Sequence, residues 1–393
     1  MDFSKTKSGT AAVWAGEVKP FAEGATTPPV FNSVTFAYDN IDDWFDSAVG
    51  KKEGHIYSRN TNPTVAVFEE KMRVLEHAEA ATSFATGMAA VSNTLFTLLS
   101  PGDRVVSIKD SYGGTSKIFM DHLPRFNVDV MLCETTDHEQ LESEVQKGCK
   151  VLYLESPTNP TLKILDLHRL IQCAKEAGTV TIVDNTFATP INQNPILLDA
   201  DLVLHSATKF LGGHSDAMGG IICGRKELVE EVFRYREING ASLSAAAAYY
   251  LIRGIKTLEL RILRQNENAL KIAQFLSKHP KIDEVYYPGL ESHPAHTIAR
   301  QQMTGFGGVL GFSLKGGFDE VKAFLTNLQF AHRAASLGSV STLVGPPKTT
   351  SHVEMTEAQR KKLGIPETLV RYSTGIENAE DLLNDLDNAL AMI

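Results

Sequence analysis

Short apolar runs alternate with segments of helical spacing through the middle of the chain. Six runs have the length and composition of buried strands: 104–108, 128–133, 150–154, 180–183, 202–204 and 219–223. Segments between them, such as 165–177, repeat apolar residues at spacings of three and four. This alternation predicts an α/β fold with a mostly parallel central sheet and helices on both faces.

The two ends of the chain follow other patterns. Residues 1–61 lack steady periodicity, so we expect an N-terminal arm that lies on another part of the fold or on a second subunit. A helix begins next, because Asn62 suits its N-cap and Pro63 its first position. The main domain is predicted over 62–254 and a smaller C-terminal α+β domain over 255–393.

Finer features follow within these two domains. The small residues of 82–90 are expected to open a second helix, and 230–276 to be largely helical. In the C-terminal domain we expect strands at 305–314 and 369–373, a helix at 318–328 and a closing helix from Ala379.

Composition narrows the classes of function. The chain has 393 residues, of which 43% are hydrophobic and 22% charged, which is typical of a globular protein. A net charge of −9 disfavours a nucleic-acid or anionic-membrane partner. No apolar run is long enough to span a membrane, and the N-terminus has no signal-peptide pattern. The four cysteines form neither a C-x-x-C pair nor a metal-binding pattern, so we expect no metal and a cytoplasmic location.

Polar residues gather where the predicted strands end. They are Tyr112, Asn159, Asp184, Ser206, Thr208 and Lys209. Ligands of open α/β sheets bind at the carboxyl ends of the strands. Lys209 could bind a phosphate as a point charge, or form a Schiff base with a carbonyl once neutral. A surface lysine is the plainer alternative, and the G-x-x-x-x-G-K-[ST] motif of a phosphate-binding loop is absent.

If Lys209 is a Schiff-base amine, pyridoxal phosphate is the cofactor to test against the remaining residues. Asp184 could face the pyridine nitrogen, although it could also be a capping residue. Tyr112 offers a ring to stack on the cofactor. Arg371 could bind a substrate carboxylate, although a structural ion pair is the alternative. Donors for the phosphate are offered by Gly87, Met88, Ser206 and Thr208.

Five motifs together resemble the Cys/Met-metabolism (transsulfuration) group of pyridoxal-phosphate-dependent enzymes. They are Tyr57-Ser-Arg59, Ser-Pro-Thr-Asn-Pro at 156–160, Asp184-Asn-Thr-Phe187, Ser206-Ala-Thr-Lys209-Phe-Leu-Gly-Gly-His and Arg371-Tyr-Ser-Thr-Gly-Ile-Glu. The resemblance covers nearly the whole chain. It implies a fold-type I enzyme, aspartate-aminotransferase-like, and a homotetramer built from two dimers that share their active sites.

The resemblance also implies a role for each site residue. Lys209 would bind the cofactor and shuttle protons, and the other catalytic candidates are Tyr112, Asp184 and Tyr57. Tyr57 and Arg59 would reach the phosphate of the neighbouring subunit, while Asn159 would lie near the cofactor hydroxyl. Arg371, helped by the backbone at Ser336, would hold the carboxylate of a small amino-acid substrate.

The implied reaction is γ-elimination from an amino acid with a heteroatom leaving group, giving a 2-oxo acid and ammonia. The alternative is γ-replacement, as in cystathionine γ-synthases and O-acylhomoserine sulfhydrylases. Two positions depart from the family pattern. Gly114 stands where methionine γ-lyases typically have a cysteine, and Ser341 where cystathionine-handling members usually carry a glutamate. The leaving group therefore stays open, and so does a catalytically silent relative.

Overall fold

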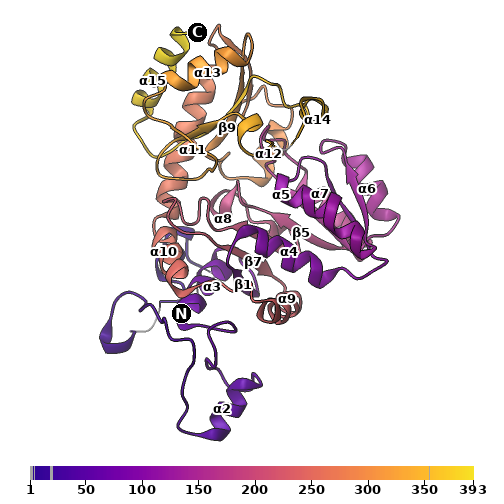
Figure 1. Ribbon diagram of the computed structural model, residues 1–393, viewed down its shortest axis with the longest axis vertical. Helices are drawn as coiled ribbons and strands as arrows, with labels where there is room; N and C mark the ends of the chain where they lie inside the picture. Colours follow the sequence, from indigo (N-terminus) through magenta and orange to yellow (C-terminus); the bar gives the residue numbers. More distant parts are fainter. Residues whose placement is uncertain (1–2, 4, 18–20, 354) are drawn as a thin grey trace.

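Two β-sheets, each covered by helices, make up the body of the protein (Figure 1). The computed structural model describes residues 3, 5–17, 21–353 and 355–393. The first sheet has seven strands in the order β1-β7-β6-β5-β4-β2-β3. The strands are β1 (Ala80–Phe84), β2 (Arg104–Ile108), β3 (Asp129–Cys133), β4 (Val151–Glu155), β5 (Val180–Asp184), β6 (Leu202–Ser206) and β7 (Gly220–Gly224). Strands β2 to β6 are parallel, and β7 runs antiparallel to both its neighbours.

Helices cover both faces of this sheet because successive strand residues point in opposite directions. Val151 and Tyr153 of β4 pack into one cluster with helices α4 (Gly87–Leu98) and α9 (Lys226–Asn239). Leu152 and Leu154 pack on the other face with α6 (His138–Gln146) and α7 (Leu167–Glu176). The predicted α/β architecture is therefore confirmed, and the strands end at one edge of the sheet.

One local prediction is wrong. Residues 82–84 do not open a helix but form the end of β1, and α4 begins at Gly87. Their main chain pairs with β7, so that Thr82 lies opposite Ile222 and Phe84 opposite Gly220. Sheet pairing has overridden the weak local preference of these small residues.

The second sheet has five strands in the order β10-β11-β12-β9-β8. They are β8 (Ile282–Tyr286), β9 (Val309–Leu314), β10 (His332–Arg333), β11 (Leu343–Gly345) and β12 (Leu369–Ser373). Its apolar side chains form a core with α11 (Leu258–Leu276), α13 (Phe318–Asn327) and α15 (Ala379–Ala391). Gly254, the predicted end of the first domain, lies inside helix α10 (Ala245–Ile255). The remaining helices are α5 (Gly113–Lys117), α8 (Thr189–Asn192), α12 (His296–Gln302) and α14 (Glu357–Lys362), with single turns at Ala22–Gly24, Ile118–His122, Leu123–Phe126, Pro195–Leu198 and Pro347–Thr349.

The N-terminal segment has two different parts. Helix α1 (Ser8–Trp14) packs on the body, where Lys71 of α3 (Pro63–Leu75) donates hydrogen bonds to the carbonyls of Ala12 and Val13. The loop that carries α2 (Ile41–Ala48) instead extends away from the body (Figure 1). Helix α2 has no buried residue, and its Ile41 is 78% exposed. The part of the predicted arm that contains α1 thus packs on the body of its own chain. The part that carries α2 buries none of its helix residues against the rest of the described chain.

The part of the chain that the structure describes has neither a membrane-spanning helix nor a cluster of metal ligands. None of its helices is long and apolar enough to cross a membrane. Nor does it contain a group of three or more His, Cys, Asp or Glu side chains that could hold a metal ion.

Candidate active site

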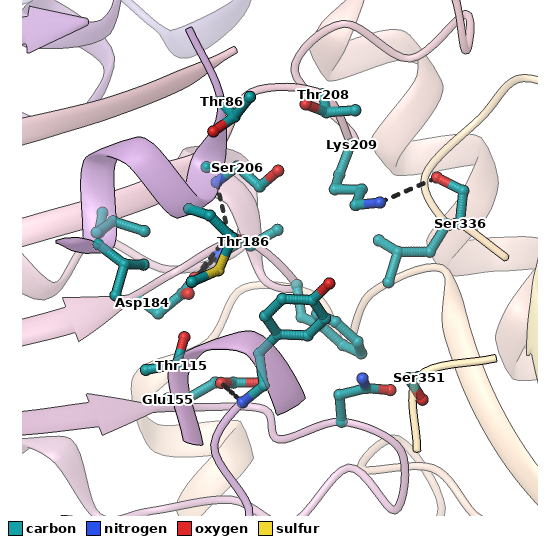
Figure 2. A pocket seen from close by; sticks show the side chains of 18 of the residues that line it. Thr86, Thr115, Glu155, Asp184, Thr186, Ser206, Thr208, Lys209, Ser336 and Ser351 are labelled. Atoms are coloured by element: carbon teal, nitrogen blue, oxygen red, sulfur yellow. Dashed lines mark hydrogen bonds between the residues drawn. The ribbon is translucent and has the colours of Figure 1, made fainter. Parts of the chain in front are cut away.

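A cavity of about 280 Å³ lies between the strand ends of the first sheet and the second sheet. The predicted residues that line it are Gly87, Met88, Tyr112, Asn159, Asp184, Ser206, Thr208, Lys209, Ser336 and Arg371. These residues come from both predicted domains. Figure 2 shows Lys209 and Ser336 approaching each other on one side of the cavity and Asp184 on another.

Lys209 follows β6 and extends its amine into the cavity. Its Nζ donates to Ser336 Oγ at 3.1 Å, and it forms no ion pair with any of the described residues. Burial, followed by the positive charge of Arg371, lowers the pKa of Lys209 to about 8. A substantial fraction of this amine is therefore neutral at mildly alkaline pH, as a nucleophile or base requires.

Arg261 of α11 holds the loop that follows Lys209. Its guanidinium donates to the carbonyls of Phe210 at 2.7 Å, Leu211 at 3.3 Å and Gly254 at 2.7 Å. Gly213 has a φ of 72°, and a Cβ there would lie 2.1 Å from Arg261 Nη1. The loop therefore needs both the glycine and the arginine, and the sequence analysis did not identify Arg261.

Asp184 ends β5 at the floor of the cavity. Its Oδ1 accepts from the Thr186 amide at 3.1 Å and the Thr186 hydroxyl at 2.6 Å, and its Oδ2 from the Tyr153 hydroxyl at 3.3 Å. Burial raises the pKa of Asp184, and the two hydrogen bonds from Thr186 oppose that shift. The carboxyl is thus held in place by neutral donors, which leaves it able to pair with a cationic ligand.

The start of α4 lines the cavity with Gly87 and Met88. The Thr86 side chain caps the helix by accepting from the Ala89 amide at 3.0 Å, while no described residue accepts from the amides of Gly87 and Met88. A Cβ at Gly87 would lie 2.7 Å from the Cβ of Ser206. Two unpaired amides at a helix N-terminus favour an anion such as a phosphate, and only glycine leaves room here.

Arg371 on β12 is buried but has no carboxylate partner in the described part of the chain. Its Nη1 donates to Asn159 Oδ1 at 3.0 Å and its Nη2 to the Ser336 carbonyl at 2.8 Å. Burial lowers the pKa of Arg371 to about 10. The structural ion pair that the sequence left open is therefore not observed, and the guanidinium remains available for an anion from outside.

Tyr112 stands at the cavity mouth with 44% of its surface exposed. Its amide donates to Glu155 Oε2 at 2.7 Å. A Cβ at Gly114 would lie 2.9 Å from the Tyr112 ring and 2.8 Å from Met88 Sδ. Gly114 therefore lets the ring and the methionine approach closely.

Three predicted residues lie outside this cavity. Arg59 stacks on the ring of Tyr57 at 5.1 Å, and both belong to the extended arm. Ser341 lines a neighbouring cavity that also includes Ser336 and Thr208, and its hydroxyl lies 3.3 Å from that of Ser339.

Six polar wall residues were not predicted from the sequence: Thr86, Thr115, Glu155, Thr186, Thr350 and Ser351. Glu155 and Thr186 carry the same signal as Asp184, a polar side chain at the end of a buried strand. Ser351 carries no such signal, because it reaches the cavity from an irregular segment of the second domain.

The chain belongs to the family described as Cys/Met metabolism PLP-dependent enzyme, whose model matches residues 9–391. It is similar to an L-methionine gamma-lyase of Fusobacterium nucleatum subsp. polymorphum, with 42% identity over 396 residues and 100% of both chains covered. A cystathionine gamma-lyase of Bacillus subtilis (strain 168) is 40% identical over 388 residues, which cover 98% of this chain and 100% of its own.

A solved structure of a related enzyme has the same fold as this chain. The cystathionine gamma synthase from Xanthomonas oryzae pv. oryzae in complex with cystathionine has a TM-score of 0.93 to this chain, with 38% identity and 98% of each chain covered. The predicted family and fold class are confirmed. The protein is thus a PLP-dependent lyase or transferase of the transsulfuration type.

Proposed function

We propose that this enzyme catalyses γ-elimination on a small amino acid with a heteroatom leaving group, and releases a 2-oxo acid and ammonia. The observation that carries this proposal is the pairing, in one cavity, of an amine with a lowered pKa and a buried arginine that has no carboxylate partner among the described residues. Relatives named as γ-lyases support elimination. Relatives named as γ-synthases keep γ-replacement as the alternative.

The residues of the cavity fit pyridoxal phosphate. Lys209 would hold its carbonyl carbon, Asp184 would face its ring nitrogen, and Tyr112 would stack on the ring. The amides of Gly87 and Met88, with Ser206 and Thr208, would receive the phosphate. Two observations support this assignment: glycine at position 87 leaves room beside Ser206, and the amides of Gly87 and Met88 have no acceptor among the described residues.

When bound, pyridoxal phosphate supplies an electron sink that acidifies the hydrogen on the substrate's α-carbon. Lys209 takes this proton as a neutral base and can return it at a neighbouring carbon, since a base with a pKa near the working pH is well matched to both steps. Arg371 binds the substrate carboxylate with its planar fork, and Asn159 and the Ser336 carbonyl fix the orientation of that fork. A second proton has to leave the β-carbon before the heteroatom group departs from the γ-carbon as its conjugate acid. Water then releases the 2-oxo acid and ammonia.

We also propose a homotetramer, a dimer of dimers, in which Tyr57 and Arg59 reach the phosphate site of a neighbouring subunit. Two features of the arm support sharing: α2 leaves large apolar side chains exposed, and the Tyr57–Arg59 stack lies outside its own cavity. A cytoplasmic location remains a prediction. The four cysteines are free thiols, which suits a reducing compartment.

A substrate screen with 2-oxo acid detection tests the reaction. The panel contains L-methionine, L-cystathionine and an O-acyl-L-homoserine, each with and without an added thiol. We expect 2-oxo acid without the thiol. A product formed only with the thiol would establish γ-replacement instead, and no turnover of any panel member by a yellow protein would indicate a silent relative.

A further inference from the structure

Two carboxyl side chains, Glu155 and Asp184, lie next to each other at the floor of the cavity. Glu155 ends β4 and Asp184 ends β5, and the two residues are paired in the register of the parallel strands. Glu155 is 4% exposed and Asp184 9%. Both line the cavity, so the floor carries two buried acids where the proposed function uses one.

The donors around the two acids are neutral and unequally shared. Glu155 Oε2 accepts from the Tyr112 amide, and the Asn159 amide also favours the Glu155 anion. Asp184 accepts from Thr186 twice and from Tyr153 once. No lysine, arginine or histidine of the described chain donates a hydrogen bond to either carboxyl. Asp184 is thus the better stabilised of the two as an anion.

The charges that face the pair add to this asymmetry. Asp110, in the turn after β2, acts on Glu155 as a second negative charge, while His205 of β6 favours the ionised form of Asp184. The two cations of the cavity, Lys209 and Arg371, are hydrogen-bonded elsewhere. Burial and then the charge of Asp184 hold the pKa of Glu155 well above its usual range. Two carboxylates in one buried site do not both ionise without a cation, and the proton falls to the less stabilised one.

We propose that Glu155 is a neutral carboxylic acid in the working enzyme and a positioning residue for its chemistry. It fixes the main chain of Tyr112, and by staying uncharged it leaves Asp184 as the single anion of the cavity floor. The role of Asp184 towards the cofactor rests on the proposed function. The protonation of Glu155 does not, because it follows from the two strands and their donors.

Thermal unfolding of the holoenzyme tests the protonation directly. Glu155→Gln replaces a neutral acid by a neutral group of the same shape, so it should leave the site intact. A carboxyl whose pKa is raised in the folded state, as proposed for Glu155, contributes most to stability at low pH. This contribution is lost as the pH rises towards the folded-state pKa. The Tm of Glu155→Gln should therefore exceed that of the wild type by about 1–3 °C near pH 8.5, and the difference should shrink towards pH 5.5.

Glu142→Gln is the matched control because its carboxylate is ionised. Glu142 accepts from Arg169 at 2.6 and 2.5 Å, and these bonds lower its pKa. Its stabilising effect is fully present above the unfolded-state pKa of about 4.5 and is lost only as the pH falls below it. The control should therefore lie below the wild type by the same amount at pH 8.5 and at pH 5.5, with no change of the difference between them. If Glu155→Gln follows the control, Glu155 is an anion and the proposal is wrong.

Rescue by the conservative variant tests the positioning role. Glu155→Ala leaves the Tyr112 amide without its acceptor, and we expect kcat/KM to fall by about tenfold or more. Glu155→Gln keeps an acceptor and should stay within about threefold of the wild type. Equal losses in both variants, or failure of Glu155→Gln alone to fold, would overturn the proposal. If Glu155→Ala does not fold, the pH dependence of Glu155→Gln decides. A wild type without turnover would contradict the proposed function, yet the unfolding comparison could still be made.

Discussion

Lys209 and Arg371 both donate hydrogen bonds to the same residue, Ser336. The Lys209 amine donates to the Ser336 hydroxyl, and the Arg371 guanidinium donates to the Ser336 carbonyl. The loop that carries Ser336 therefore sets the spacing between the proposed base and the proposed carboxylate anchor. Because Arg371 also lowers the pKa of Lys209, the two residues are coupled electrostatically as well.

Lys209→Ala should remove both the covalent attachment of the cofactor and turnover. No other described amine lines the cavity, so none can replace it. The absorbance of the purified protein and the rate of 2-oxo acid release are the two measurements. Lys278→Ala, which changes an exposed lysine, should keep both. A variant at position 209 that stays yellow and fully active would show that Lys209 is not the cofactor lysine.

Arg371→Met should change both substrate binding and the pH profile. Loss of a charge-assisted fork costs about 1.5–3 kcal/mol, so kcat/KM should fall roughly ten- to a hundredfold. Removal of the positive charge should raise the pKa of Lys209, and the acid limb of the kcat/KM profile should move to higher pH. Arg371→Lys should restore the limb but not the affinity, since an ammonium has no planar fork. An unchanged limb in Arg371→Met would contradict the coupling.

Mixed subunits should recover activity if the site is shared. Arg59→Ala and Lys209→Ala are each expected to be inactive, because each lacks one half of every site. After exchange of subunits, some hybrid sites contain both an intact Arg59 and an intact Lys209. Activity should therefore return on mixing, in an amount set by the fraction of such sites. Exchange is verified with a tagged subunit, and its occurrence without any recovery would count against sharing.

Ser341→Glu should shift substrate preference towards cystathionine. Ser341 borders a cavity adjoining Ser336, and a glutamate there could attract the distal ammonium of that substrate. The gain should be roughly ten- to a hundredfold in relative kcat/KM, the value of a close charged contact. Ser341→Gln is the neutral control of similar size. A wild type that already prefers cystathionine widely would show that this serine does not set specificity.

Glu17→Ala should destabilise the protein through the base of the N-terminal segment. Glu17 bridges the buried Lys71 at 2.8 Å and Lys256 at 2.7 Å. Loss of one partner from a buried pair costs about 3–5 kcal/mol, because the other charge stays buried. Asp319→Asn, which breaks the exposed pair with Lys322, should change the free energy of unfolding by less than about 1 kcal/mol. Equal effects of the two changes in thermal unfolding would contradict this account.

Local patterns predicted most of the first sheet. Asn62 caps α3 by accepting from the Thr64 amide at 2.9 Å, as its position before Pro63 indicated. Strand β1 could not be found in this way, since its main chain is held by pairing with β7, which lies far along the sequence. Helix α2 was missed because its apolar residues face no core of their own chain, and Asn40 was its only clear signal.

The cofactor residues were easier to predict than the contacts that hold them. Strand ends identify Asp184 and Lys209, because parallel strands bring their carboxyl ends to one edge. The Asn159–Arg371 hydrogen bond joins residues 212 positions apart, and no local pattern reports such a contact. Glu155 had the strand-end signal, but its meaning depends on the register that places it beside Asp184.

The three carbonyls around Arg261 have a consequence for recombination between related enzymes. One of them belongs to Gly254, and two belong to the loop after Lys209, whereas the guanidinium comes from α11. A chimaera joined at residue 254 would therefore take the loop after Lys209 from one parent and Arg261, which holds that loop, from the other. Where the two parents differ in this loop or in α11, the chimaera loses these hydrogen bonds. A functional crossover therefore has to take the loop and helix α11 from the same parent.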